Sequence, residues 1–168
     1  MAERFKVGDK VICTGHFPGV IEGIEQKVVS GHELRFYIVR ILQSDARIMI
    51  PTDSPGPAQP RRPISRREVE QIYQILGSRD SHPTEEETET WNRRYQRYQV
   101  VLKTGSLFEI AGLLKALHQR KKTKGSAFGE AKVIQTAMDL LVGEVTSAGQ
   151  SRSETVRREI ELRLEATS

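Results

Sequence analysis

The chain of 168 residues contains one cysteine, Cys13, and no long run of apolar residues. A single cysteine excludes an intramolecular disulfide and leaves no plausible thiolate zinc site, so a buried structural thiol is the expected role of Cys13. A helix that crosses a membrane needs about 20 apolar residues, and the N-terminus has no apolar segment of the kind found in a signal peptide. We therefore expect a soluble cytoplasmic protein without a membrane partner.

The sequence also lacks the usual signatures of catalysis. No glycine loop is followed by the Lys-Ser/Thr pair of a phosphate-binding loop. The four histidines lie in separate segments without metal-ligand spacing, at His16, His32, His82 and His118. A cluster of glutamates precedes residue 91, at Glu85, Glu86, Glu87 and Glu89. The macrodipole of a following helix already accounts for acidic residues there. We expect no enzymatic activity, no catalytic residue, no metal and no cofactor.

Positive charge is concentrated in the second half of the chain, although the net charge is only +4. Residues 1–57 carry seven basic and seven acidic residues, whereas residues 61–132 carry 15 basic and nine acidic residues. A local excess of this kind attracts phosphate through the release of counterions, but many solvated helix faces have a similar composition. The charge pattern is therefore compatible with a nucleic-acid partner without requiring one.

The first fifty residues have the pattern of β-structure. Short apolar segments separated by glycine-containing turns predict five strands, at about 10–12, 19–24, 28–29, 34–41 and 46–50. Residues 34–41 carry apolar side chains on both faces, which predicts a central strand. Five short strands with tight turns predict a small, strongly curved barrel.

Five prolines between residues 51 and 63 mark a domain boundary, because proline fixes φ and removes an amide donor. We take residues 53–63 as a linker between a β-domain, residues 1–52, and an all-α domain, residues 64–168. Five helices are predicted in the second domain. Four begin at capping boxes (Ser65 with Glu68, Thr84 with Glu87, Ser106 with Glu109, Ser151 with Glu154) and one near Gly129. The fold class is α+β.

The only tryptophan, Trp91, stands beside three arginines in a helical pattern. One face of this helix carries Trp91, Tyr95, Tyr98 and Leu102, and its flank carries Arg93, Arg94 and Arg97. Two interpretations compete. A half-buried core aromatic with solvated arginines beside it is the usual case for an amphipathic helix. The alternative is an aromatic wedge for unstacked bases.

Several motifs, in this order, resemble the CarD/CdnL family of bacterial RNA polymerase-binding transcription factors. They are Phe5-Lys6-Val7-Gly8-Asp9-Lys10-Val11, Arg61, Trp91-Asn92-Arg93-Arg94-Tyr95, Gly105, Gly125 and Leu140-Leu141-Val142-Gly143-Glu144-Val145. The resemblance covers nearly the whole chain. It implies a Tudor-like barrel that docks on the polymerase β subunit, and a helical domain that reaches promoter DNA at the upstream fork of the transcription bubble. Members of this family stabilise the open promoter complex.

The resemblance also implies roles for individual residues, and at Trp91 it favours the wedge, with Tyr95 on the inward face of the helix. Polymerase binding is expected at Lys27, Val29, Arg47 and Met49. DNA binding is expected at Trp91, Arg93, Arg94, Arg97, Lys121, Lys122, Lys124 and Lys132. Lys27 stands where arginine is frequent and so lacks a planar bidentate fork, and Met49 replaces a frequently basic residue. We expect a monomer that reaches the nucleoid through polymerase.

Two other functions fit the same residues. A protein–protein adaptor would pair an edge strand of the barrel with a partner strand and make no direct DNA contact. A free-standing nucleic-acid binder would bind DNA alone with a steep dependence on salt.

Overall fold

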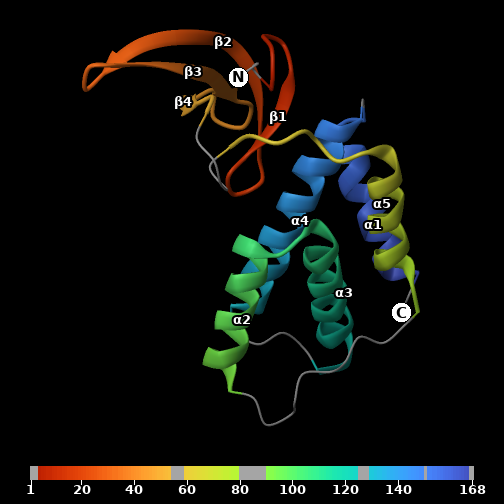
Figure 1. Ribbon diagram of the computed structural model, residues 1–168. Coiled ribbons are helices and arrows are strands. Elements are labelled where there is room, and N and C mark those ends of the chain that lie inside the picture. The colour runs from red at the N-terminus through yellow and green to blue at the C-terminus, as the bar shows by residue number, and fades with distance from the viewer. Residues whose placement is uncertain (1–3, 54–58, 80–89, 125–128, 150, 167–168) are drawn as a thin grey trace. The chain divides into compact units, whose positions relative to one another are not determined.

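The computed structural model describes residues 4–53, 59–79, 90–124, 129–149 and 151–166. The chain divides into two compact units, residues 1–64 and residues 65–168, which are considered separately (Figure 1). The described part of the first unit contains four strands and that of the second contains five helices. The predicted α+β class, with strands before helices, is therefore confirmed. No helix in the described ranges is long and apolar enough to cross a membrane.

The four strands form one antiparallel sheet in the order β1-β2-β3-β4, with β1 at Lys10–Cys13, β2 at Phe17–Val29, β3 at His32–Ile41 and β4 at Arg47–Pro51. The sheet curls into a half-barrel (Figure 1). The prediction of five strands is wrong, because residues 19–24 and 28–29 belong to the single strand β2. Exposed polar residues 25–27 interrupt the apolar pattern, but their backbone continues the ladder with β3.

Strand β3 lies between β2 and β4, which confirms the prediction that it is central. A two-residue turn joins β2 to β3. Its residues, Ser30 and Gly31, have φ values of 52° and 81°. Positive φ at both turn positions matches the right-handed twist of the paired strands, which explains why this long hairpin closes so tightly.

The concave core of the sheet unit is built around Tyr37, which is completely buried. Its ring meets the ring of Phe5 edge-on at 5.8 Å. The Tyr37 hydroxyl accepts hydrogen bonds from the backbone N–H groups of Arg4 (2.9 Å) and Phe5 (3.3 Å). Cys13 is buried in the same core, as expected, and this burial raises the pKa of its thiol.

Arg61, between Pro60 and Pro63 of the predicted linker, also belongs to the sheet unit. The N–H of Ile12 in β1 donates to the Arg61 carbonyl at 2.8 Å, and the N–H of Arg61 donates to the Ile12 carbonyl at 3.0 Å. Arg61 therefore covers part of the β1 edge of the sheet. Residues 54–58 of the predicted linker lie outside the described residues.

The helices are α1 (Arg66–Gly77), α2 (Trp91–Thr104), α3 (Leu107–Lys124), α4 (Glu130–Ala148) and α5 (Ser153–Glu165). The capping box of Ser65 with Glu68 is confirmed. Ser106 also accepts from the Glu109 N–H, at 3.2 Å. The box predicted at Ser151 is wrong, because Arg152 occupies the N-cap of α5 without a side-chain cap bond. The box predicted at residues 84 and 87 lies outside the described residues.

Apolar side chains from all five helices form the core of the second unit. Helix α1 packs on α3 and α5, α4 packs on α3 and α5, and α2 packs on α3 and α4. The completely buried side chains include Ile72, Leu76, Ile110, Leu114, Leu141 and Ile160. This packing fixes the first turn of α2 against the start of α4, where the candidate nucleic-acid site lies.

Candidate functional sites

Trp91 is the first residue of α2 and is half-buried. Its ring lies 5.7 Å from the ring of Tyr95 and 6.4 Å from that of Tyr98, and the guanidinium of Arg94 lies 5.5 Å from its centroid. A Cβ atom added at Gly129 would come within 2.9 Å of the indole Cζ2 atom. The indole is therefore supported on several sides but keeps part of its surface accessible to a partner.

The inward face of α2 differs from the expectation at one position. Tyr98 and Leu102 are buried, but Tyr95 is 41% exposed, so its assignment to the inward face is wrong. Tyr95 packs against Trp91 near the start of the helix instead of entering the core. The half-buried state of Trp91 lies between the two interpretations of the sequence, a core aromatic and an exposed wedge.

The three arginines of α2 occupy different environments. Arg93 and Arg97 are exposed, and the guanidinium of Arg97 lies 5.7 Å from the Tyr98 ring. The Arg94 side chain is only 12% exposed and approaches the carboxylate of the buried Glu130 at 3.9 Å. Only Arg93 and Arg97 are thus presented to solvent in the way that a phosphate contact requires.

Three helix ends meet around this site: the start of α2, the end of α3 and the start of α4 (Figure 1). Trp91 of α2 touches Gly129, the N-cap of α4, and Arg120 of α3 lies 3.1 Å from Glu130 of α4. The same helix ends carry further exposed cations, at Lys121, Lys122 and Lys132. The side chain of Lys124 lies outside the described part of the chain. Apart from Arg97, which lies in the middle of α2, the predicted DNA-binding residues that the structure describes therefore lie on these three helix ends.

Sequence reasoning missed Gly129 and Glu130 as parts of this site. In the sequence they indicate only the start of a helix, which they also form. A glycine followed by an acidic residue before an apolar helix is common at helix starts, and nothing in that pattern indicates contact with a tryptophan 38 positions earlier.

His118 of α3 lies one turn before the basic end of that helix. Its pKa is lowered from the ordinary value of 6.5, first by burial and then by the charge of Lys122, against a weaker opposing effect of Glu165. The unfolded chain therefore binds a proton at this residue at a higher pH than the folded chain does.

We expect the free energy of unfolding to decrease as the pH falls through 6.5 toward the lowered pKa of His118. His118→Gln should reduce this loss, since glutamine does not titrate. Urea unfolding followed by Trp91 fluorescence at pH 7.5 and 5.5 measures the effect. His32→Gln, at an exposed position of β3, controls for the loss of a histidine. An identical pH dependence in His118→Gln and the wild-type protein would contradict the expectation.

The predicted polymerase-binding residues share one face of the curled sheet. Lys27 pairs with Leu34 and Met49 pairs with Ile38, so both lie on the side of β3 opposite Tyr37 and Val39. The Lys27 Nζ atom lies 3.7 Å from the Met49 Sδ atom. Five exposed residues of this side make up what we call the outer face: Lys27, Val29, Leu34, Arg47 and Met49.

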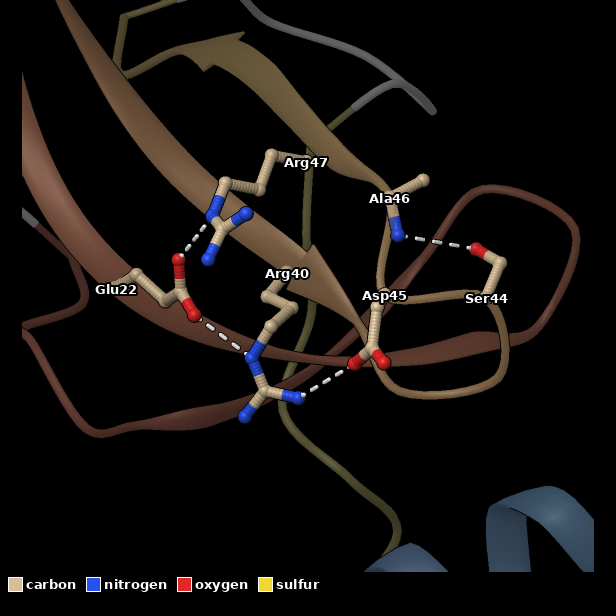
Figure 2. Close-up of polar contacts among 6 residues, drawn as sticks. All are labelled: Glu22, Arg40, Ser44, Asp45, Ala46 and Arg47. Atoms are coloured by element: carbon tan, nitrogen blue, oxygen red, sulfur yellow. Dashed lines mark hydrogen bonds and ion pairs between the residues drawn. The ribbon is translucent and has the colours of Figure 1, made fainter.

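Arg47 is tied to Glu22 on this face (Figure 2). A bulge in β2 near Glu22 lets its carboxylate accept from Arg47 Nε and Arg40 Nε at 2.7 Å each, and Arg40 also reaches Asp45 at 3.2 Å. The hydrogen bond from Arg47, followed by that from Arg40, lowers the pKa of Glu22. The hydrogen bond that Arg40 donates to Glu22 raises the pKa of Arg40. Arg47 is therefore engaged by Glu22 on the outer face.

None of the described residues forms a cluster of three or more His, Cys, Asp or Glu side chains that could hold a metal ion. The two surfaces present a partly accessible aromatic ring, exposed cations and exposed apolar side chains.

Comparison with known proteins assigns both units. Residues 5–57 match the CarD-like/TRCF RID domain, and residues 71–161 match the CarD C-terminal domain. A curled sheet of the first type followed by helices of the second type defines a transcription factor of the CarD kind. The second match alone spans more than half of the chain, and this protein belongs to the CarD family. The resemblance inferred from the sequence motifs is thereby confirmed.

A curated relative supports the same assignment. Over 141 residues the chain is 27% identical to the Bacillus subtilis (strain 168) protein named "Putative transcription factor YdeB", and the aligned part covers 84% of this chain and 90% of that protein. The similarity therefore extends through both units.

Proposed function

We propose that this protein binds the β subunit of RNA polymerase through the outer face of its sheet and stabilises the open promoter complex by inserting Trp91 at the upstream edge of the bubble. Membership of the CarD family supports a role in transcription. The observation that carries the DNA part of the proposal is a partly accessible indole among exposed cations at three converging helix ends.

The proposed mechanism is a difference in affinity between two states of the promoter. A bound protein shifts an equilibrium only if it interacts more strongly with one state. Closed duplex DNA offers no unstacked base to an indole, whereas the edge of a bubble does. Arg93, Lys121 and Lys132 would fix the protein on the phosphates without reading sequence, because phosphate contacts carry no base information. Addition of the protein to polymerase and promoter should therefore slow the decay of open complexes at promoters of different sequence.

Lys27→Glu is expected to weaken binding to RNA polymerase about tenfold, or ~1.4 kcal/mol. Lys27 is exposed on the outer face and is central to the predicted contact. Retention of purified polymerase by the immobilised full-length protein measures the change. Arg158→Glu makes the same change of charge at an exposed position of α5 and should leave retention unaltered. Equal retention by Lys27→Glu and the wild-type protein would argue against the outer face as the binding surface.

A second candidate is an adaptor that binds proteins without touching DNA. It is favoured by β4, which ends the described sheet and exposes Ile48 and Met49. An edge strand of this kind can pair with a strand of a partner. Fluorescence of Trp91 separates the two functions. Quenching by forked DNA in the presence of polymerase supports the wedge, and emission that DNA does not change supports the adaptor.

A further inference from the structure

The start of α4 contacts the indole of Trp91 and restricts its position. We propose that Arg94 is a positioning residue, held by Glu130, which fixes the indole for insertion and does not contact phosphate. This inference rests on the proposed function of Trp91. It concerns a cluster of three charged side chains from three helices, which we call the ion cluster: Arg94 of α2, Arg120 of α3 and Glu130 of α4.

The centre of the ion cluster is the carboxylate of Glu130, which is 0% exposed. Its Oε1 atom lies 3.1 Å from Arg120 Nε and 3.9 Å from Arg94 Nη2. A carboxylate removed from water requires nearby cations or hydrogen-bond donors. Glu130 therefore holds Arg94 toward the interior of the unit, away from the direction in which DNA would approach an exposed arginine.

The same Arg94 guanidinium lies 5.5 Å from the centroid of the indole. A planar guanidinium stacks on an aromatic ring as well as pairing with a carboxylate, and a lysine ammonium cannot do both in the same way. Arg94 contacts both Glu130 and the indole, so a fixed Glu130 also restricts the position of the Trp91 ring.

Gly129 provides a second, independent constraint on the indole. Its φ of 91° is one that residues with a side chain rarely adopt, and a Cβ atom there would approach the indole Cζ2 atom to 2.9 Å. The ring thus lies directly against the backbone at the N-cap of α4. A tryptophan held between this backbone and Arg94 loses less conformational freedom when it stacks on a base than a freely rotating one does.

The direct test compares Arg94→Lys with Arg93→Lys in the full-length protein. Trp91 is the only tryptophan, so acrylamide quenching and time-resolved anisotropy report on this ring alone. Arg94→Lys keeps the charge but loses the planar guanidinium, and should raise the quenching rate constant roughly twofold. Arg93→Lys changes an exposed neighbour in the same way and should leave Trp91 fluorescence unchanged. Equal quenching in Arg94→Lys and the wild-type protein overturns the inference.

Gly129→Ala tests the second constraint without changing any charge. The added Cβ should displace the indole and increase quenching, with helical content by circular dichroism showing that the unit is still folded. A folded Gly129→Ala variant with wild-type quenching and anisotropy would overturn the proposed backbone constraint at the start of α4.

Open-complex lifetimes separate this inference from the proposed function. If the function holds, Trp91→Ala shortens the lifetime, and Arg94→Lys shortens it by a smaller factor, about threefold. A loosened indole in Arg94→Lys with a wild-type lifetime, while Trp91→Ala is defective, would refute positioning and leave the function intact. A loosened indole with no change of lifetime in either variant would instead refute the function and leave the support of the indole established.

Discussion

Trp91→Ala is expected to shorten the lifetime of the open promoter complex about tenfold while leaving polymerase binding nearly unchanged. An aromatic side chain stacked on an exposed base contributes ~1–3 kcal/mol, and ~1.4 kcal/mol corresponds to a factor of ten. The outer face of the sheet unit does not include Trp91, so retention of polymerase should persist. The decay of heparin-resistant complexes on a promoter fragment measures the lifetime.

A second variant and a folding control make this result specific. Trp91→Phe keeps an aromatic ring of smaller area and should give an intermediate lifetime, because a smaller ring stacks over less of the base. Circular dichroism is needed for both variants, since the half-buried indole also contacts Tyr98 of the helical core. If a folded Trp91→Ala variant supports open complexes as long-lived as those of the wild-type protein, the wedge mechanism is wrong.

The part of the fold that depends on side-chain pattern was predictable, and the part that depends on backbone pairing was not. In β3, apolar residues on both faces indicate a central strand. The continuity of β2 through residues 25–27 has no such pattern, since those residues are polar and exposed and are held only by the ladder with β3. The predicted N-cap of α5 also differs from the observed one. Ser151 is a residue type that often caps helices, but Arg152 occupies the N-cap.

At the candidate DNA site the sequence identified Trp91 but could not distinguish Arg93 from Arg94. Adjacent residues on a helix point about 100° apart, so which arginine meets Glu130 depends on the packing of α4 beside α2. The two have the same chemistry in the sequence. In the structure one is exposed and the other is nearly enclosed beside a carboxylate. Only tertiary contact separates them.

The composition of the outer face also depends on the register of the strands. Lys27 and Met49 are 22 positions apart, and their side-chain ends lie within 3.7 Å because β3 pairs with both strands. A shift of one residue in either pairing would send one of the two side chains to the core side. The resemblance to a known family indicated both residues but did not give the register of the strands that carry them. The structure shows that they share a face.

Tyr37→Ala should destabilise the sheet unit by about 3–5 kcal/mol, the range for removing a buried aromatic side chain. Tyr37 is completely buried, packs on Phe5, and accepts the backbone N–H groups that hold the N-terminal segment. Tyr37→Phe keeps the ring and removes only the acceptor, so its cost should be nearer 1 kcal/mol. Hydrogen exchange of residues 10–51 measures the stability of this unit.

The position of Trp91 allows the effect of Tyr37→Ala to be assigned to one unit. Because the only tryptophan lies in residues 65–168, its fluorescence during urea unfolding reports on the helical unit. We expect exchange protection of the sheet and polymerase retention to be lost in Tyr37→Ala, while the midpoint detected by Trp91 stays at its wild-type value. A fluorescence midpoint that falls together with the exchange protection would show that the two units unfold as one, and loss of polymerase binding could then no longer be assigned to the sheet.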